Sequence, residues 1–175
     1  MMTAGRRINT TSVHWNTPPK FTIPIREFFG GIIDLDPCSN EESIVGANTE
    51  LYEGGLEHDW NQHESIFVNP PYGRGIKDWL RKCHETDSEI IALIPVATNT
   101  THWKEFIYKS DVICFLYDTR LKFMIGENTN NKGASMSCCL VYWGDRKEKF
   151  VQHFSKRYGE CCVVIEKKNN FSRIK

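Results

Sequence analysis

Hydrophobic and polar residues alternate along the chain in blocks that predict an α/β fold. Short, almost wholly apolar runs are typical of strands buried on both faces, and they alternate with segments that carry apolar residues at helical spacing. The predicted strands are residues 31–36, 65–68, 90–94, 112–116, 136–143 and 161–166, with a short one near 51–52. The predicted helices are residues 21–29, with Pro24 in the first turn, 76–84, 101–109 and 147–156. Such alternation favours a mainly parallel sheet.

Length and charge narrow the classes of protein. A chain of 175 residues with 40% hydrophobic content predicts one domain over residues 1–175, in which 1–12 form a flexible arm and 169–175 a disordered tail. Because 22 basic and 22 acidic residues cancel, any contact with nucleic acid must come from a local basic patch. The absence of a signal peptide and of an apolar stretch of 18 residues argues against export and membrane insertion. We therefore expect a cytoplasmic protein.

The cysteine pattern does not indicate a disulfide framework or a metal site. The chain has seven cysteines, including adjacent pairs at 138–139 and 161–162, and no Cys-x-x-Cys pair. Neighbouring residues of a strand point to opposite faces, so buried reduced thiols are the simplest explanation. The six histidines have no paired ligand spacing. No metal is therefore expected, and the pattern does not indicate an oligomeric state.

The most informative motif is Asn69-Pro70-Pro71-Tyr72, which directly follows the apolar run 65–68. Each proline fixes its own φ and biases the preceding residue toward extended geometry, which directs the oxygens of Asn69 and Pro70 to one point. Two such acceptors can each take an N–H of an exocyclic amine and leave its lone pair aimed at an electrophilic methyl group. Tyr72 offers a flat face on which an extruded base can stack. The alternative is a stiff turn that merely ends a strand.

Further motifs surround this loop in a definite order along the chain. They are Trp15-Asn16-Thr17-Pro18-Pro19, Asp34 to Ser39, Gly55-Leu56, Asp59-Trp60, Asp78-Trp79-Leu80, Ile94 to Thr98 with Trp103, and residues 119–123 and 137–141. Together they resemble the phage-type DNA N6-adenine methyltransferase (Dam-like) family over roughly residues 15–143. The resemblance implies a Rossmann-like class I fold, S-adenosylmethionine as donor, S-adenosylhomocysteine as product and adenine N6 in DNA as target. It also implies modification of phage DNA against restriction inside a bacterial host cell.

The resemblance also assigns roles to residues. For catalysis it implies Asn69, Pro70, Pro71 and Tyr72, and for the donor Trp15, Thr17, Pro18, Asp36, Pro37, Cys38, Asp59 and Asn69. Asp36 has independent support, because ligands of open α/β sheets bind beyond the carboxyl ends of strands. The carboxylate on the donor ribose stays open between Glu50, Glu53 and Asp59.

Two features depart from the family pattern. No glycine follows Asp36 in the segment Pro-Cys-Ser-Asn, so the backbone must approach the donor differently from the usual glycine-rich turn. Only 32 residues separate Asp36 from Asn69, which is too few for two complete βα units. We therefore expect a sheet that is shortened between its first strand and the Asn-Pro-Pro-Tyr loop.

Basic residues near the motifs are candidates for DNA contact. With Tyr72, the candidates are Arg74, Lys77, Arg120, Lys122 and Lys132. Arg120 and Lys122 alternate with two apolar residues, which places both on one face of a strand. The polar segment 126–135 is either a simple connector or a gate over the substrate.

Two other functions remain open on the sequence alone. The same loop suits amino-methylation of adenine in RNA or of a glutamine side chain. The shortened sheet is also compatible with a catalytically silent nucleic-acid-binding module on this scaffold. A silent module with a degraded pocket gains no thermal stability from S-adenosylmethionine, whereas an active enzyme does.

Overall fold

A computed structural model of the chain describes residues 16–116, 124–125, 128–129, 136–158 and 162–164. The arm 1–12, the tail 169–175 and most of the segment 126–135 lie outside these ranges. Four candidate site residues, Trp15, Arg120, Lys122 and Lys132, also lie outside them.

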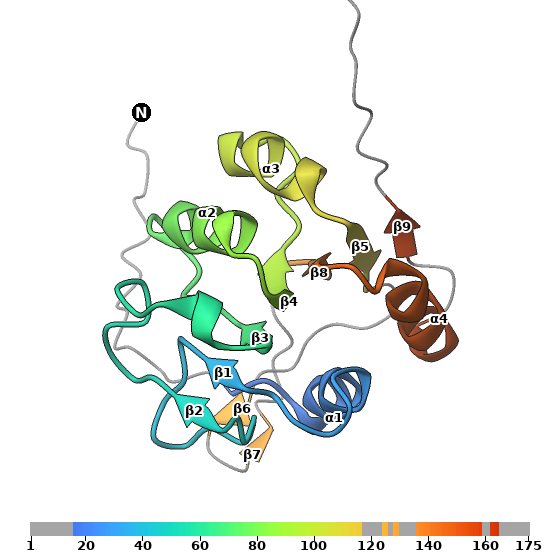
Figure 1. Cartoon of the computed structure of the whole chain (residues 1–175). Helices are drawn as coiled ribbons and strands as arrows, with labels where there is room; N and C mark the ends of the chain where they lie inside the picture. The colour runs from blue at the N-terminus through green and yellow to red at the C-terminus, as the bar shows by residue number, and fades with distance from the viewer. Residues whose placement is uncertain (1–15, 117–123, 126–127, 130–135, 159–161, 165–175) are drawn as a thin grey trace, which may run out of the picture.

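Four helices and nine strands make up the described fold (Figure 1). The helices are α1 (Pro19–Phe28), α2 (Ile76–Glu85), α3 (Thr101–Glu105) and α4 (Lys147–Tyr158), with 3-10 turns η1 (Trp60–Gln62) and η2 (Ile107–Lys109). The strands are β1 (Leu35–Asp36), β2 (Thr49–Glu50), β3 (Ser65–Val68), β4 (Glu89–Pro95), β5 (Val112–Phe115), β6 (Met124–Ile125), β7 (Asn128–Thr129), β8 (Cys138–Trp143) and β9 (Cys162–Val164). The α/β class predicted from the sequence is confirmed.

The main sheet has seven strands in the order β2-β1-β3-β4-β8-β5-β9. β2, β1, β3 and β4 pair in parallel, whereas β8 pairs antiparallel with both β4 and β5, and β9 pairs antiparallel with β5. β5 therefore runs in the same direction as β4. Most strands share one direction, as expected, but the two reversed strands make the sheet mixed.

The chain changes direction across the sheet between β1 and β3. From β1 it moves to β2 on one side, and it then returns to place β3 on the other side of β1. In open α/β sheets, ligands bind beyond the carboxyl ends of the two strands at which the strand order reverses, and we call this region between β1 and β3 the crevice. Asp36 ends β1 and Asn69 follows β3, so both residues lie at this crevice.

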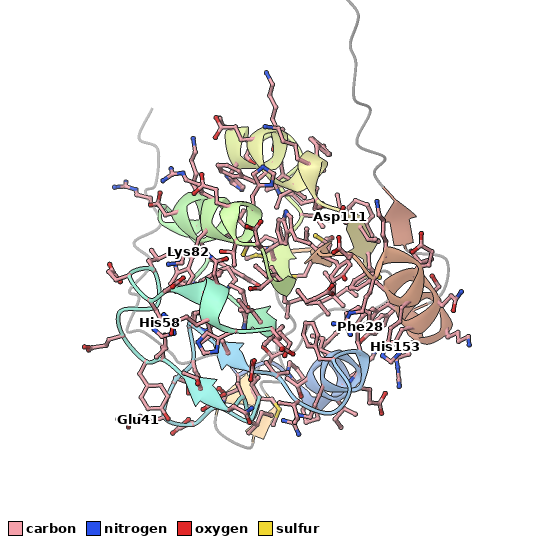
Figure 2. All side chains as sticks on the ribbon, in the orientation of Figure 1. Phe28, Glu41, His58, Lys82, Asp111 and His153 are labelled. Carbon is pink, nitrogen blue, oxygen red and sulfur yellow. The ribbon has the colours of Figure 1, made fainter. Side chains whose placement is uncertain are left out.

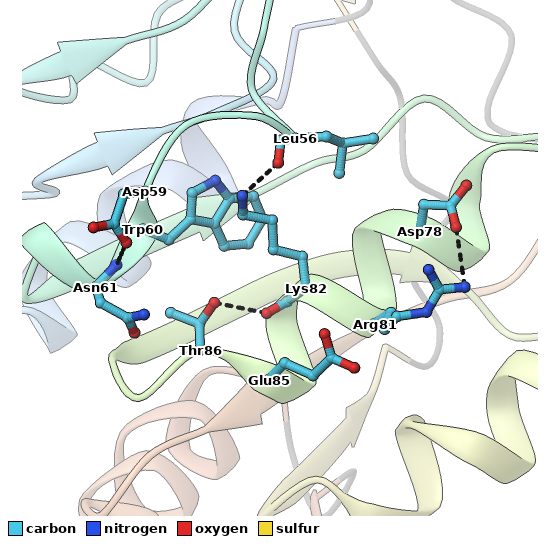
Figure 3. A pocket seen from close by; sticks show the side chains of 9 residues that line it. All are labelled: Leu56, Asp59, Trp60, Asn61, Asp78, Arg81, Lys82, Glu85 and Thr86. Carbon is cyan, nitrogen blue, oxygen red and sulfur yellow. Dashed lines mark hydrogen bonds and ion pairs between the residues drawn. The ribbon is translucent and has the colours of Figure 1, made fainter.

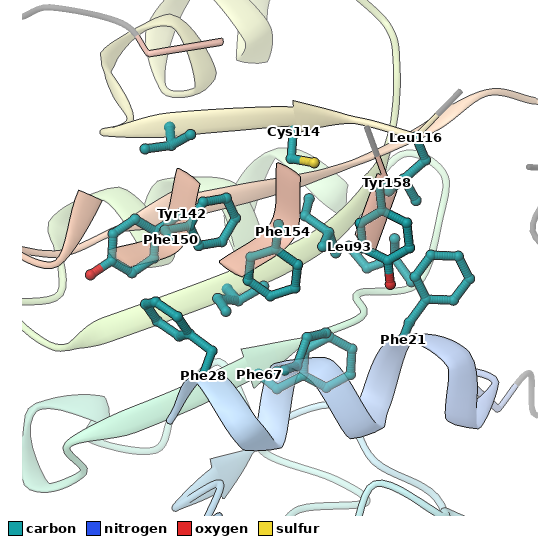
Figure 4. Packing of buried hydrophobic residues seen from close by; sticks show 14 of the residues in the cluster. Phe21, Phe28, Phe67, Leu93, Cys114, Leu116, Tyr142, Phe150, Phe154 and Tyr158 are labelled. Carbon is teal, nitrogen blue, oxygen red and sulfur yellow. The ribbon is translucent and has the colours of Figure 1, made fainter. Parts of the chain in front are cut away.

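Helices cover both faces of the sheet (Figure 1). α1 and α4 pack on one face through an aromatic cluster that includes Phe28, Phe150 and Phe154, shown in Figure 4. α2 and α3 pack on the other face with Leu80 and Trp103. The predicted alternation of adjacent cysteines is confirmed at β8, because Cys138 belongs to the first cluster and Cys139 to the second.

The helix α1 begins earlier than expected and carries Pro24 in its interior rather than in its first turn. Proline has no N–H for the carbonyl four residues before it, here that of Lys20. Tyr158 Oη on α4 donates to Lys20 O at 3.1 Å, and His153 Nε2 donates to Pro24 O at 2.8 Å. His153 lies beside Phe28 on α1 (Figure 2). Side chains of α4 therefore satisfy the backbone of α1 around the proline.

Two other elements differ from expectation. The helix predicted over residues 101–109 is broken, because α3 ends at Glu105 and η2 follows as a 3-10 turn. The short strand expected near residues 51–52 is β2, which lies two residues earlier, and no α-helix lies between β1 and β3. The segment between β1 and β3 contributes only the two-residue strand β2 to the sheet. In the described part of the chain, no helix is long and apolar enough to cross a membrane.

Candidate active site

The Asn-Pro-Pro-Tyr loop lies at the carboxyl end of β3. All four residues of β3 are buried, and the strand pairs in parallel with β4 on one side and with β1 on the other. The register Leu35↔Ile66 places Cys38 level with Asn69. Pro70 is buried and Pro71 is exposed, and Gly73, with φ of 147°, turns the chain toward α2. The loop thus leaves the sheet at a defined position beside the segment after β1.

The side chain of Asn69 is oriented by the N-terminal segment. Asn69 Nδ2 donates a hydrogen bond to Thr17 Oγ1 at 3.1 Å, and Thr17 is only 2% exposed. No residue in the described part of the chain donates to Asn69 Oδ1 or to the carbonyl of Pro70. The two acceptor oxygens expected to hold an amine therefore remain available in this structure.

Asp36 is a buried carboxyl group at the end of β1. It is 3% exposed, and its Oδ1 accepts a hydrogen bond from the backbone N–H of Cys38 at 3.1 Å. Burial raises the pKa of Asp36 to about 7, and the negative charge of Glu50 adds to the rise, whereas the Cys38 N–H opposes it. A buried carboxylate with few protein partners is a favourable neighbour for a positively charged ligand.

Cys38 connects Asp36 to Asn69. Its thiol contacts the backbone N–H of Asn69, while its own N–H is bonded to Asp36. Burial raises the pKa of the Cys38 thiol well above its usual range, and Asp36 raises it further. Cys38 is therefore a neutral thiol at neutral pH. Pro37, between these residues, packs its backbone so closely against Gly55 that a Cβ there would lie 1.8 Å from Pro37 O.

The loop between β1 and β2 is folded around the carboxylate of Glu50. Glu50 Oε1 accepts hydrogen bonds from Gly46 N at 3.1 Å, Ala47 N at 3.2 Å and Ser43 Oγ at 3.4 Å, which holds the loop closed. Glu50 Oε2 has no hydrogen-bond partner among the described residues. Of the three carboxylates considered for the donor ribose, Glu50 is the one beside Asp36, since β1 and β2 pair Asp36 with Glu50.

Asp59 is not brought to this crevice by any contact in the structure. It is exposed and caps η1, accepting from Asn61 N and from Gln62 Nε2, both at 3.1 Å. These bonds lower the pKa of Asp59. Asp59 and Lys82 of α2 line a cavity of about 420 Å³, shown in Figure 3. Lys82 Nζ donates to the carbonyl of Leu56, as the figure shows, and also to the carbonyl of His58.

Tyr72 is partly buried beside the loop. Its hydroxyl donates to Leu93 O of β4 at 3.2 Å, and it also lies near the thiol of Cys138. Burial raises the pKa of the Tyr72 phenol well above its usual value, so it stays neutral. The ring is therefore anchored to the sheet through its hydroxyl edge.

Of the basic candidates that the structure describes, Arg74 and Lys77 differ in their surroundings. Arg74 is exposed in the turn between Tyr72 and α2. Lys77 Nζ forms an ion pair with Glu105 Oε2 of α3 at 2.8 Å. Arg74 is thus accessible to a phosphate without rearrangement, whereas Lys77 must leave Glu105 first. In the described ranges no cluster of His, Cys, Asp or Glu is arranged to hold a metal ion.

Sequence reasoning missed two features of the site. It placed Thr17 over the donor but did not foresee its contact with Asn69, which is 52 residues away in sequence. It also assigned no role to Ser39, whose Oγ is buried and has no hydrogen-bond partner in the described structure. The register of β1 with β3 places residues 38–39 beside Asn69, and this register cannot be predicted from one sequence alone.

A comparison with known proteins identifies the arrangement. Residues 7–159 match a family model described as DNA N-6-adenine-methyltransferase (Dam). The chain belongs to this family. No curated protein and no solved structure matches it. The resemblance noted in the sequence is confirmed, and the matched range contains the sheet strands from β1 to β8, all four helices and the Asn-Pro-Pro-Tyr loop.

Membership in the DNA N-6-adenine-methyltransferase family indicates the reaction for which this part of the structure must be examined. The family is one of enzymes that methylate adenine at N6 in DNA, and its members use S-adenosylmethionine. Asp36 after β1 and Asn69 after β3 both lie at strand ends of the kind where ligands of open α/β sheets bind.

Proposed function

We propose that this chain transfers a methyl group from S-adenosylmethionine to N6 of adenine in DNA within the crevice between β1 and β3. The observation that supports this most directly is the state of Asn69. Its Nδ2 is bonded to Thr17 and its Oδ1 has no donor in the described structure, next to the buried carboxyl group of Asp36. The sheet is proposed to be a shortened Rossmann-like class I methyltransferase fold, supported by the reversal of strand order at β1 and β3.

The residues after β1 fit a cationic, hydroxyl-bearing donor. Ser39 Oγ is buried without a partner in the described structure, Asp36 is a buried carboxyl group, and Glu50 has one oxygen held and one without a partner. S-adenosylmethionine, when bound, supplies an electrophilic methyl group on a positively charged sulfur. We assign Asp36, Pro37 and Cys38 to the donor site with Glu50 as the ribose carboxylate, and the backbone of Thr17 and Pro18 to its N-terminal boundary, since the Thr17 hydroxyl is bonded to Asn69.

The Asn-Pro-Pro-Tyr loop would hold the target amine. Asn69 Oδ1 and Pro70 O each accept one N–H, which concentrates the nitrogen lone pair on the side that faces the donor. Pro71 stiffens the loop, and Tyr72, anchored at Leu93, stacks on the extruded base. Asn69 is neither an acid nor a base, so the proton released after transfer passes to solvent. The loop therefore contributes orientation and electrostatics.

DNA would approach from the side on which Tyr72 and Arg74 emerge. Arg74 is exposed next to the loop and is suited to a phosphate contact, which positions DNA without reading its sequence. Lys77 would join only by exchanging Glu105 for a phosphate. We further propose that the modification protects phage DNA against restriction in the cytoplasm of a bacterial host.

The test is methyl transfer from labelled S-adenosylmethionine to unmethylated duplex DNA, with nucleosides identified by mass spectrometry. We expect N6-methyladenine from the wild type, none from Asn69→Ala, and a wild-type rate from the control Asn61→Ala, which changes an exposed residue of η1. Equal N6-methyladenine from wild type and Asn69→Ala would show that the loop is misassigned. Transfer only to RNA or to a protein amide, or donor binding without any transfer, would replace the proposed substrate or the proposed activity.

A further inference from the structure

We infer that Thr17 is a positioning residue that sets the orientation of the Asn69 side-chain amide for methyl transfer. The inference rests on the proposed function for its catalytic meaning, and on one contact for its geometry. That contact is the hydrogen bond from Asn69 Nδ2 to Thr17 Oγ1, at 3.1 Å.

A carboxamide has two chemically different ends, and only one of them suits the reaction. The target amine presents N–H groups, so Asn69 must offer it Oδ1, an acceptor, and not Nδ2, a donor. In that orientation Nδ2 points away from the base and needs an acceptor of its own, because a polar group left unpaired on burial costs about 1–3 kcal/mol. Thr17 Oγ1 is the acceptor in this structure.

Thr17 is itself held in place on both sides. Asn16, the residue before it, exchanges two backbone hydrogen bonds with Met124 of β6, at 2.9 and 3.0 Å. The carbonyl of Pro18, the residue after it, accepts from Phe21 N at 2.9 Å at the start of α1. Asn16 Oδ1 also accepts from Asn40 Nδ2 at 2.9 Å, which ties the segment to the loop after β1.

These contacts distinguish a positioning role for Thr17 from a role in covering the donor. Thr17 is 2% exposed, and its hydroxyl accepts the hydrogen bond from the amide of Asn69. Removal of the hydroxyl should therefore change the rate of transfer and leave donor affinity largely unchanged. A donor-binding role predicts the opposite result.

The experiment compares Thr17→Val, which keeps the shape of the side chain and removes the hydroxyl, with Thr17→Ser, which keeps the hydroxyl. We expect Thr17→Val to lower kcat by about 10- to 100-fold with the dissociation constant for S-adenosylmethionine within about twofold of wild type. Thr17→Ser should restore most of the rate. A weakened donor with an unchanged kcat, or no change in either quantity, would overturn the inference.

A second readout does not depend on activity. In the protein without donor or DNA, the Asn69 side-chain amide protons are followed by NMR and assigned by their absence in Asn69→Ala. We expect one of them to exchange with water about tenfold faster in Thr17→Val than in wild type or Thr17→Ser. If the wild type is active and Thr17→Val changes neither kcat nor the exchange of the Asn69 amide protons, this inference is overturned and the proposed function stands. An inactive wild type whose amide responds as expected would overturn the proposed function and leave the contact standing.

Discussion

Two carboxyl groups at opposite ends of the sheet have very different surroundings. Glu89 begins β4, and its carboxylate has hydrogen-bond donors within the protein. It accepts from Tyr142 Oη, from Asp145 N at 3.1 Å and from Arg146 Nε at 3.0 Å. Asp36 ends β1, accepts hydrogen bonds only from the backbone N–H and the thiol of Cys38 among the described residues, and has the negative charge of Glu50 beside it. Glu89 is neutralised by a cation of the protein, whereas burial and the charge of Glu50 raise the pKa of Asp36, which suits the cationic ligand that we propose for it.

The largest expected effect is on the pH dependence of stability. The unfolded pKa of Asp36 is near the ordinary 3.8 and the folded pKa is about 7, so between these values the folded state binds more protons and stability falls as the pH rises. At about 1.4 kcal/mol per unit the loss has an upper limit of about 4 kcal/mol. We expect Asp36→Asn to match wild type near pH 4 and to become more stable than wild type toward pH 8, measured by denaturant unfolding without donor. Parallel stability curves for the two proteins would show that Asp36 is already ionised and paired at pH 5.

The next largest effect is on donor binding. The same substitution that should stabilise the fold should weaken the binding of S-adenosylmethionine. Asp36→Asn removes the negative charge expected to face the donor, and loss of one partner of a buried charge pair costs about 2–5 kcal/mol. We expect affinity for S-adenosylmethionine at pH 8 to fall by about 100-fold, measured by isothermal titration calorimetry. Asp87→Asn, an exposed carboxylate next to β4, is the matched control and should bind like wild type. Unchanged binding by Asp36→Asn would move the donor away from β1.

A smaller effect is expected at the other end of the sheet. Glu89→Ala removes three hydrogen bonds, one of them from the cation Arg146, and we expect a loss of about 2 kcal/mol in the free energy of unfolding. Donor affinity of the folded variant should stay at the wild-type value. Glu41→Ala, an exposed carboxylate, should change stability by less than about 0.5 kcal/mol. A loss of donor affinity in Glu89→Ala would contradict the separation of the two ends.

The smallest effect concerns the interior proline of α1. Tyr158→Phe removes the hydroxyl that satisfies Lys20 O, and we expect a loss of about 1 kcal/mol, measured by thermal unfolding. Tyr108→Phe is the control, because Tyr108 Oη bonds Thr98 O at 3.3 Å from a side chain that is 44% exposed. Similar losses in the two variants would mean that burial does not strengthen the bond to Lys20.

The sequence predicts the elements of this protein better than their arrangement. Apolar runs located β3, β4 and β8, and the period of apolar residues located α2, because these patterns depend on neighbours along the chain. They do not encode which strand pairs with which, so the position of the reversed β8 between β4 and β5 was not foreseen. The carbonyl of Lys20, which Pro24 leaves without its helical donor, accepts from Tyr158, far along the chain.

The candidate site shows the same division. The Asn-Pro-Pro-Tyr motif and Asp36 were predicted, since a strand followed by a polar turn is a local signal. The contact of Thr17 with Asn69 and the ion pair of Lys77 with Glu105 join residues from different elements. The family resemblance assigned Asp59 to the donor, and in the structure its side chain caps η1.

The central position of β8 has a consequence for synthesis of the chain. β8 supplies the partner for one edge of β4 and for one edge of β5, yet it is made only after residue 137 has emerged from the ribosome. Until then the apolar strand β4 presents an open edge, which is a template for pairing with other chains. If translation pauses or the message ends before Cys138, the sheet is incomplete and the unpaired edge of β4 is prone to aggregation. We therefore expect chaperones to bind the nascent chain in this interval.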